Sequence, residues 1–236
     1  DGDLDLVLGN HLGPNTILWN QGELVFDAAP LGEGRTRAVT IVDVDADGRR
    51  DIVLTTNTGA INYWQNQGER IFERRQLPGV ARPAYSINWG DLDRDGDLDL
   101  VTAPYDAGFL TDRGNSYLLN GGSGVIYYEN RTENVTETQT GAPQGRFVAK
   151  QLAGGAQALA LALTDIDADG RTDILVGNDF GVPDYVFVQR DGGWVESTPF
   201  TVTAHSTMSF DLGDIDNNGL LDLFSTDMKP YTFDEE

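Results

Sequence analysis

A nine-residue acidic segment recurs along the chain and restricts the folds that are open to it. Its most acidic copy, residues 91–99, reads Asp-Leu-Asp-Arg-Asp-Gly-Asp-Leu-Asp, with carboxylates at places 1, 3, 5, 7 and 9 and glycine at place 6. Carboxylates this close repel one another unless a cation lies between them. The glycine predicts a sharp turn with positive φ, which glycine adopts without steric cost. The segment therefore indicates a cation-binding loop rather than a helix or a strand.

The same spacing occurs in four other places. Residues 43–51, 165–173 and 214–222 are complete copies, and residues 1–5 form the second half of a fifth. Every copy ends in Asp at place 9 and leads into apolar residues. Calcium takes ~6–8 oxygen ligands at about 2.3–2.6 Å, and alternating side chains of a tight loop can supply them. We therefore expect Ca²⁺ at about four complete sites and one truncated site.

The loop is not an EF-hand. An EF-hand loop carries a bidentate Glu at place 12, whereas this chain has Leu54, Thr102, Val176 or Ser225 there. No helical pattern flanks the copies. A loop between two strands is the remaining interpretation.

The copies are spaced like the units of a β-propeller. The glycines at place 6 lie at residues 2, 48, 96, 170 and 219, so three of the four intervals are 46, 48 and 49 residues. This period suits a four-stranded blade, and each unit reads as a strand, the acidic loop and three more strands. Since one such sheet cannot bury both faces alone, the units must stack. The prediction is an all-β fold, a β-propeller of about five four-stranded blade units.

The predicted boundaries make residues 1–236 a single β-propeller domain or fragment. Its units are 1–30, 31–78, 79–153, 154–203 and an incomplete 204–236, with insertions at 104–124 and 131–145. The expected strand counts are three, four, four, four and two, with strands at 24–26 and 70–72 after a shared Asn-Gln-Gly-Glu turn. Such a ring is open at both ends. We therefore expect a larger, for example seven-bladed, propeller, or a second chain that completes it.

Composition excludes several classes of function. The chain has 16 basic and 38 acidic residues, and about half of the acidic ones lie in the loops. Without a basic stripe, nucleic acid is not an expected partner. Cysteine is absent, which excludes disulfides and thiol catalysis. No apolar run approaches the ~20 residues of a membrane span, and no catalytic motif is present, so we expect no membrane insertion and no enzymatic activity.

The motif D-x-D-x-D-G-x-x-D, placed between strands, resembles the FG-GAP/VCBS repeat family, the calcium-binding repeat of integrin α-subunit propellers and of many bacterial surface proteins. Residues 205–230 are similar to the bacterial branch related to cartilage acidic protein and UnbV-type proteins. Asn218 replaces a carboxylate, which predicts weaker binding in the last loop. The metal ligands that the resemblance implies are Asp43, Asp45, Asp47, Arg49 (carbonyl), Asp51, Asp91, Asp93, Asp95, Asp97, Asp99, Asp165, Asp167, Asp169, Arg171 (carbonyl), Asp173, Asp214, Asp216, Asn218, Leu220 (carbonyl) and Asp222, with Asp1, Asp3 and Asp5 in the truncated copy.

The expected function is a non-enzymatic, calcium-binding β-propeller module that mediates adhesion or protein–protein assembly. Weak calcium sites fill only where calcium is plentiful, which favours an extracellular, cell-surface or periplasmic location. The insertion 104–124 is the expected contact with a protein or glycan partner, because long loops on rigid scaffolds often carry binding. Two alternatives are the propeller domain of a calcium-dependent polysaccharide lyase and a structural subunit of a larger surface complex.

Overall fold

The described part of the chain is built from antiparallel β-sheets. A computed structural model describes residues 2–56, 59–105, 124–131, 147–179, 182–204 and 206–228. Asp1 and most of the two predicted insertions lie outside these ranges. Contacts separate the chain into two compact units, residues 1–85 with 130–149 and residues 86–129 with 150–236. None of the described segments forms a helix of the length and hydropathy needed to cross a bilayer.

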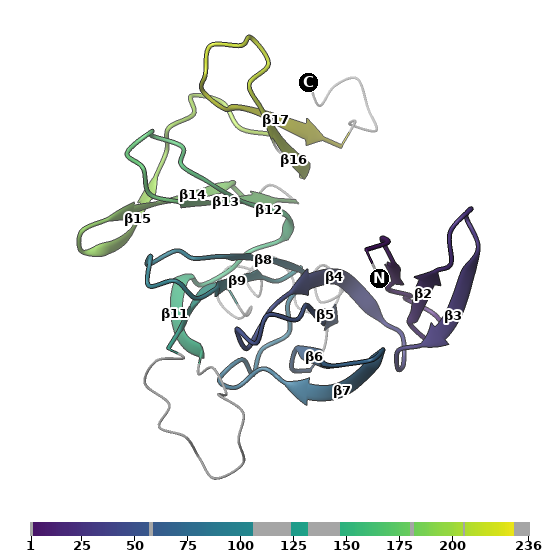
Figure 1. The fold of residues 1–236 in the computed structure, drawn as a ribbon. Coiled ribbons are helices and arrows are strands. Elements are labelled where there is room, and N and C mark those ends of the chain that lie inside the picture. The colour runs from purple at the N-terminus through teal and green to yellow at the C-terminus, as the bar shows by residue number, and fades with distance from the viewer. Residues whose placement is uncertain are drawn as a thin grey trace. The chain divides into compact units, whose positions relative to one another are not determined.

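Five sheets follow one another along the sequence (Figure 1). The first contains β1 (Leu6–Leu8), β2 (Thr16–Asn20) and β3 (Phe26–Pro30). The second contains β4 (Thr36–Val42), β5 (Asp51–Thr56), β6 (Asn62–Gly68) and β7 (Ile71–Gln76). The third contains β8 (Ser86–Gly90), β9 (Asp99–Ala103), β10 (Val125–Asn130) and β11 (Phe147–Ala153).

The fourth sheet contains β12 (Ala158–Thr164), β13 (Asp173–Asn178), β14 (Tyr185–Arg190) and β15 (Gly193–Ser197), and the fifth β16 (Thr207–Gly213) and β17 (Asp222–Asp227). Neighbouring strands in a sheet are consecutive in the sequence and antiparallel. Within the described residues the sheets have three, four, four, four and two strands, which confirms the predicted counts. This is the strand arrangement of propeller blades.

The second strand of each four-stranded sheet is its most buried part. β5, β9 and β13 are buried along almost their whole length, and each has two or three consecutive apolar residues directly after its first aspartate. A strand that is apolar on both faces must have both faces covered. The fourth strand differs: β7 carries Glu73, Arg74 and Arg75 and is largely exposed. The burial therefore falls from the second strand to the outer edge, as stacked blades require.

Each compact unit has its own apolar core. In the first unit Ile17 and Leu31 from the first sheet pack with Ile52 and Leu54 from the second. In the second unit Val101, Val125, Ile174 and Val176 lie in one buried cluster. A smaller cluster joins Leu175, Val186 and Val188 to the partly buried Phe210 and Leu223 of the last sheet. Packing between sheets within a unit thus buries the faces that a single sheet would expose.

The predicted strand at residues 24–26 was wrong at its start. Glu23 and Leu24 have φ of 51° and 62°, and Val25 N–H donates to the Gly22 carbonyl. Two successive left-handed residues are the mark of a type I′ hairpin turn. Leu24 is 89% exposed, so its apolar side chain does not indicate a strand here. β3 begins only at Phe26.

A polar clamp that the sequence analysis did not identify joins neighbouring sheets in each unit. Asn15 Oδ1 accepts hydrogen bonds from Asn10 N–H at 2.9 Å and from the Thr36 hydroxyl at 2.8 Å. In the second unit Asp184 accepts from Asn178 N–H at 2.7 Å and from the Thr207 hydroxyl at 2.8 Å. In both cases the threonine begins the first strand of the following sheet. One side chain therefore ties a loop of one sheet to the next sheet.

Glycine lets these threonines approach. A Cβ added at Gly177 would lie 2.4 Å from Thr207 Cγ2, and one added at Gly9 would lie 2.6 Å from Thr36 Cγ2. Both glycines precede an asparagine, in Gly9-Asn10 and Gly177-Asn178. The Gly-Asn pair is followed by Pro14-Asn15 in the first unit and by Pro183-Asp184 in the second. This repeated pattern is the feature of the sequence from which the clamp could have been predicted.

We predict that Gly177→Ala destabilises the protein by about 1–3 kcal/mol, because the new methyl group overpacks a closed contact. Urea unfolding followed by circular dichroism measures the change. Gly213→Ala is the control, since a Cβ at that strand residue meets no atom within 4 Å. Thr207→Ser removes the clashing methyl group while keeping the hydroxyl, so the double variant should recover part of the loss. Equal effects at Gly177 and Gly213 would contradict the close contact.

Candidate metal centres

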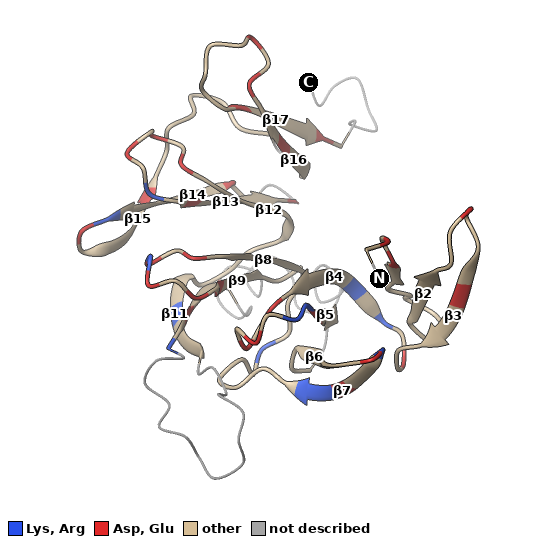
Figure 2. Ribbon diagram, viewed as in Figure 1, with Lys and Arg blue, Asp and Glu red and all other residues tan. Residues whose placement is uncertain are grey.

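Four described loops join the first and second strands of their sheets. They are residues 43–51, 91–99, 165–173 and 214–222, and the red segments of the ribbon in Figure 2 mark Asp and Glu along them. In each loop three carboxylates offer oxygens that all lie within 4.8 Å of one another. The groups are Asp43, Asp45 and Asp51; Asp91, Asp93 and Asp95; Asp165, Asp167 and Asp173; and Asp214, Asp216 and Asp222.

The aspartate at place 9 holds each loop against its sheet. Asp51 is 1% exposed; its Oδ2 accepts Val44 N–H at 3.0 Å and its Oδ1 accepts Asn66 N–H at 2.8 Å. Asp173 repeats both bonds, with Ile166 at 3.0 Å and Gln189 at 2.8 Å. One carboxylate therefore joins the start of the loop to the third strand of the sheet. Sequence reasoning predicted this residue only as a metal ligand.

The truncated first copy keeps part of this arrangement. Asp5 Oδ1 accepts Asn20 N–H at 2.8 Å, just as Asp51 Oδ1 accepts Asn66 N–H. Asn20 and Asn66 also donate their side-chain amides to the carbonyls of Leu4 and Arg50, one residue before each place 9. The shared Asn-Gln-Gly-Glu turn of the sequence is thus a structural anchor for the loop. The predicted roles of Asp3 and Asp5 as metal ligands stay predictions.

The aspartate at place 1 closes the turn. Asp43 Oδ1 and Oδ2 accept the N–H groups of Asp47 and Gly48, at 3.1 and 2.8 Å. Asp165 and Asp214 make the same pair of bonds in their own loops. These bonds turn the backbone around place 1 and bring places 1, 3 and 9 together.

Two residues of each complete loop have left-handed backbone. The glycines at place 6 have φ between 83° and 99°, which confirms the predicted turn. Place 4 was not predicted: Ala46, Arg94, Ala168 and Asn217 have φ of 57°, 66°, 56° and 59°. Asparagine adopts this region more readily than most residues, whereas an alanine there costs about 1–2 kcal/mol. The loops therefore contain local strain at Ala46 and Ala168.

Loop 43–51 contains a buried carboxylate oxygen that has no hydrogen-bond partner. Asp45 is 6% exposed, and its Oδ2 accepts Gln65 Nε2 at 2.5 Å, but its Oδ1 has none. A buried charged oxygen without a partner is costly. The three clustered carboxylates are hard oxygen donors of the kind that Ca²⁺ and Mg²⁺ prefer. The residues present therefore fit a divalent cation held by Asp43, Asp45 and Asp51.

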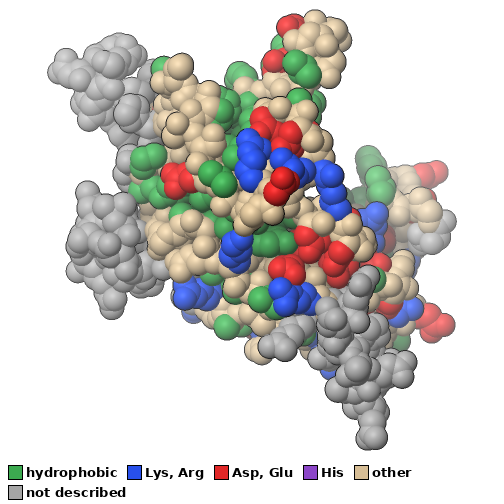
Figure 3. Space-filling model, turned by 90° about the vertical axis from the view of Figure 1, so that its left-hand side faces the viewer, with side chains coloured by type: hydrophobic (Ala, Val, Ile, Leu, Met, Phe, Trp, Pro, Cys, Tyr) green, Lys and Arg blue, Asp and Glu red, His purple; other side chains and the backbone are tan. Residues whose placement is uncertain are grey.

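Carboxylates at place 5 face arginines in two of the loops. Asp47 pairs with Arg49, and Asp169 pairs with Arg171 at 2.5 Å. In Figure 3 basic side chains lie directly against acidic ones on one face. Asn218 Oδ1 accepts Leu220 N–H at 2.8 Å. The metal-binding roles of Asp47, Asp169 and Asn218 stay predictions. The same holds for the backbone carbonyls of Arg49, Arg171 and Leu220.

Loop 91–99 uses a different set of carboxylates. Its clustered oxygens come from places 1, 3 and 5, Asp95 taking the part that place 9 has elsewhere. Asp99 is completely buried, and its Oδ2 accepts Leu92 N–H at 3.0 Å and the Tyr127 hydroxyl at 3.1 Å. The tyrosine on β10 thus satisfies a carboxylate that the sequence predicted as a ligand. Asp97 stays a predicted ligand through its carbonyl.

Burial makes several of these carboxylates weaker acids. Desolvation raises the pKa of Asp51 to about 6, although hydrogen bonds from Asn66 and Val44 N–H oppose it. Desolvation also raises the pKa values of Asp93 and Asp173. The reverse holds at Asp169, where the Arg171 N–H is the largest of the contributions that lower the pKa. Without a cation, the buried carboxylates hold their negative charge at a cost.

Repeated antiparallel sheets, four of which have an acidic loop between their first two described strands, define a β-propeller-type repeat protein. The family model described as FG-GAP-like repeat matches residues 1–54, 43–102 and 165–225, together more than half of the chain. The chain belongs to this repeat family, as the sequence predicted. No curated protein matches it. The narrower resemblance to the cartilage acidic protein branch stays a prediction.

Stability of the metal-free protein should fall as the pH rises from about 4 to about 6. The folded-state pKa of Asp51 lies above its ordinary value of 3.8, so the folded protein binds the proton more tightly than the unfolded chain does. The stability that this proton contributes is lost as the pH rises through that window. Calcium should reverse the trend, because coordination requires ionised carboxylates. Urea unfolding of metal-stripped and calcium-loaded protein tests both. Metal-free stability that increases over this window would contradict the prediction.

The strain at place 4 predicts that Ala168→Gly stabilises the protein by about 0.5–1 kcal/mol, since glycine adopts positive φ freely. The control is Ala28→Gly in the exposed part of β3, where glycine should destabilise by a similar amount because of its larger loss of backbone entropy. Thermal unfolding compares the two variants. Destabilisation by both would show that the loop does not hold Ala168 in the left-handed region.

Proposed function

We propose that this chain is a calcium-binding, non-enzymatic β-propeller module that acts in adhesion or assembly in an extracellular, cell-surface or periplasmic setting. The observation that carries the proposal is the buried, unpartnered Oδ1 of Asp45, on a carboxylate that clusters with those of Asp43 and Asp51, one oxygen from each lying within 4.8 Å of the others. A divalent cation there would satisfy this oxygen and neutralise its neighbours. The membership of the FG-GAP-like repeat family supports the same assignment.

The structural role of the cation follows from what each loop connects. Loop 43–51 leaves β4 and enters β5, and through Asp51 it also contacts β6. A cation held by Asp43, Asp45 and Asp51 would join these three strands at one end of the sheet. It would also reduce the repulsion in a chain whose formal net charge is −22. Calcium suits this better than magnesium, because magnesium demands a stricter octahedral geometry and retains its water.

A structural role agrees with the way the loop carboxylates are used. Those at places 1 and 9 of loops 43–51 and 165–173 already accept backbone N–H groups. Groups held in this way support a rigid ion site rather than proton transfer. The location is proposed because weak calcium sites fill only where calcium is abundant. The proposed protein or glycan contact at 104–124 falls mainly on residues outside the described ranges.

Calcium should raise the melting temperature strongly, and chelation with EGTA should lower it. Each site adds about 2.7 kcal/mol when calcium exceeds its dissociation constant a hundredfold. Magnesium should restore stability poorly. Calorimetric titration of calcium into metal-stripped protein measures the number of sites.

Two matched variants assign the effect to loop 43–51. Asp45→Asn removes the charge of the buried carboxylate and should reduce both the calcium-dependent rise in melting temperature and the number of sites. Asp27→Asn makes the same chemical change at an exposed position of β3, outside the loops, and should leave both unchanged. A melting temperature that does not respond to calcium in the unaltered protein would rule out the proposed metal binding.

A further inference from the structure

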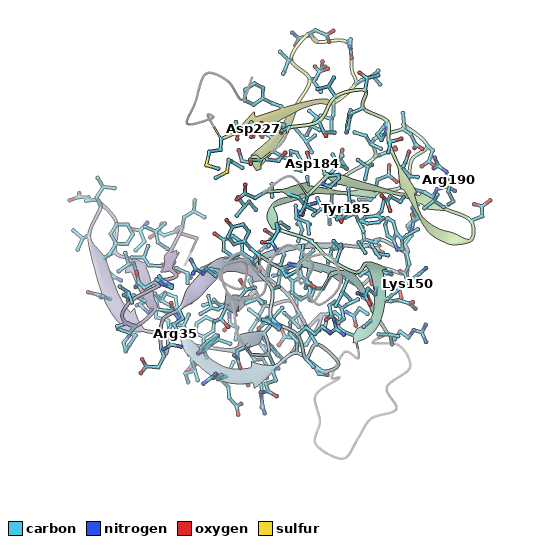
Figure 4. The ribbon with its side chains drawn as sticks, turned by 180° about the vertical axis from the view of Figure 1, so that it is seen from behind. Arg35, Lys150, Asp184, Tyr185, Arg190 and Asp227 are labelled. Atoms are coloured by element: carbon cyan, nitrogen blue, oxygen red, sulfur yellow. The ribbon has the colours of Figure 1, made fainter. Side chains whose placement is uncertain are left out.

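Arg190 at the end of β14 contacts the carboxylates of loop 165–173. Its Nη2 lies 2.5 Å from Asp167 Oδ2, and its Nη1 lies 2.9 Å from Asp169 Oδ2. Asp167 belongs to the cluster of Asp165, Asp167 and Asp173 that would hold the cation. Figure 4 labels Arg190 at one end of β14, and Asp184 and Tyr185 at its other end. The guanidinium of Arg190 therefore pairs with a carboxylate that the proposed cation would also use as a ligand.

Other groups add positive charge at the same loop. Arg171 Nη2 lies 2.5 Å from Asp169 Oδ2, and its Nη1 lies 3.0 Å from Asp191. Arg94, from loop 91–99 in the same compact unit, donates to the Gly170 carbonyl. In loop 43–51, by comparison, the arginine that pairs with a loop carboxylate is Arg49, on Asp47. Asp45 instead receives the neutral Gln65 amide.

By sequence position, Gln67 of β6 corresponds to Arg190 of β14. The place-9 carboxylates Asp51 and Asp173 accept the N–H groups of Asn66 and Gln189, which makes these two positions equivalent. The residues that follow are Gln67 and Arg190. The local pairing differs, however: a bulge between Asn66 and Gly68 interrupts the pairing of β6 with β7, whereas Arg190 pairs regularly with Gly193.

We propose that Arg190 sets the calcium affinity of loop 165–173, so that this loop fills at a higher calcium concentration than loop 43–51. The inference rests on the proposed calcium binding. A cation and a guanidinium compete for Asp167 and repel each other, so binding requires Arg190 to leave the loop. Exposed ion pairs are individually weak, which predicts about a tenfold difference in dissociation constant rather than loss of the site.

The amide N–H groups of Gly48 and Gly170 report on the two loops separately. Each donates to its place-1 carboxylate, Asp43 Oδ2 at 2.8 Å and Asp165 Oδ2 at 2.7 Å. Calcium titration of ¹⁵N-labelled protein, followed by NMR, should move the Gly48 signal at the lower concentration. In Arg190→Gln the Gly170 midpoint should fall about tenfold while the Gly48 midpoint stays in place.

The control is Arg75→Gln, which breaks the exposed pair with Glu73, outside the acidic loops, and should move neither midpoint. A Gly170 midpoint that is unchanged in Arg190→Gln overturns the role of Arg190, even if both glycines respond to calcium. No response of either glycine in the unaltered protein overturns the proposed calcium binding as well. Because Arg190→Gln should gain affinity at one loop and leave the other unchanged, misfolding cannot produce the expected result.

Discussion

The hydrogen bonds of the place-9 aspartate are the interaction on which the loops depend, and they are paired most clearly in loops 43–51 and 165–173. Asp51 and Asp173 are buried, and each accepts one N–H from its own loop and one from the third strand. Charge-assisted bonds of this kind are stronger than neutral ones. They place a negative charge beside two other carboxylates of the loop, and this cluster of oxygens fits a divalent cation.

The two ends of a sheet are built for different tasks. β14 shows both: Arg190 contacts the acidic loop at one end, and Asp184 at the other end accepts the Thr207 hydroxyl of the next sheet (Figure 4). Charged side chains and tight turns lie at the loop end. At the clamp end, a threonine that packs against Gly177 joins neighbouring sheets. Burial raises the pKa of Asp184 too, but here a hydroxyl and an N–H satisfy the carboxylate.

Differences among the loops come from the residues around them. Loop 43–51 has a buried Asp45 next to Gln65, loop 91–99 has Asp99 satisfied by Tyr127, and loop 165–173 has Arg190. The loop motif is shared, so these neighbours decide how much negative charge stays available. Copies of the repeat therefore differ in the partners of their carboxylates while keeping the same left-handed positions in the loop backbone.

The sequence by itself determined the repeat, the position of every acidic loop, the strand counts and the positive φ of the place-6 glycines. These follow from local chemistry: alternating apolar residues, glycine in turns and carboxylates at fixed spacing. Tertiary structure alone decided that Leu24 lies in a turn, that Ala168 is left-handed, and that Gln65, Tyr127 and Arg190 face the loops. Those contacts join residues up to 28 positions apart, and no local pattern encodes which strand end comes to lie beside which carboxylate.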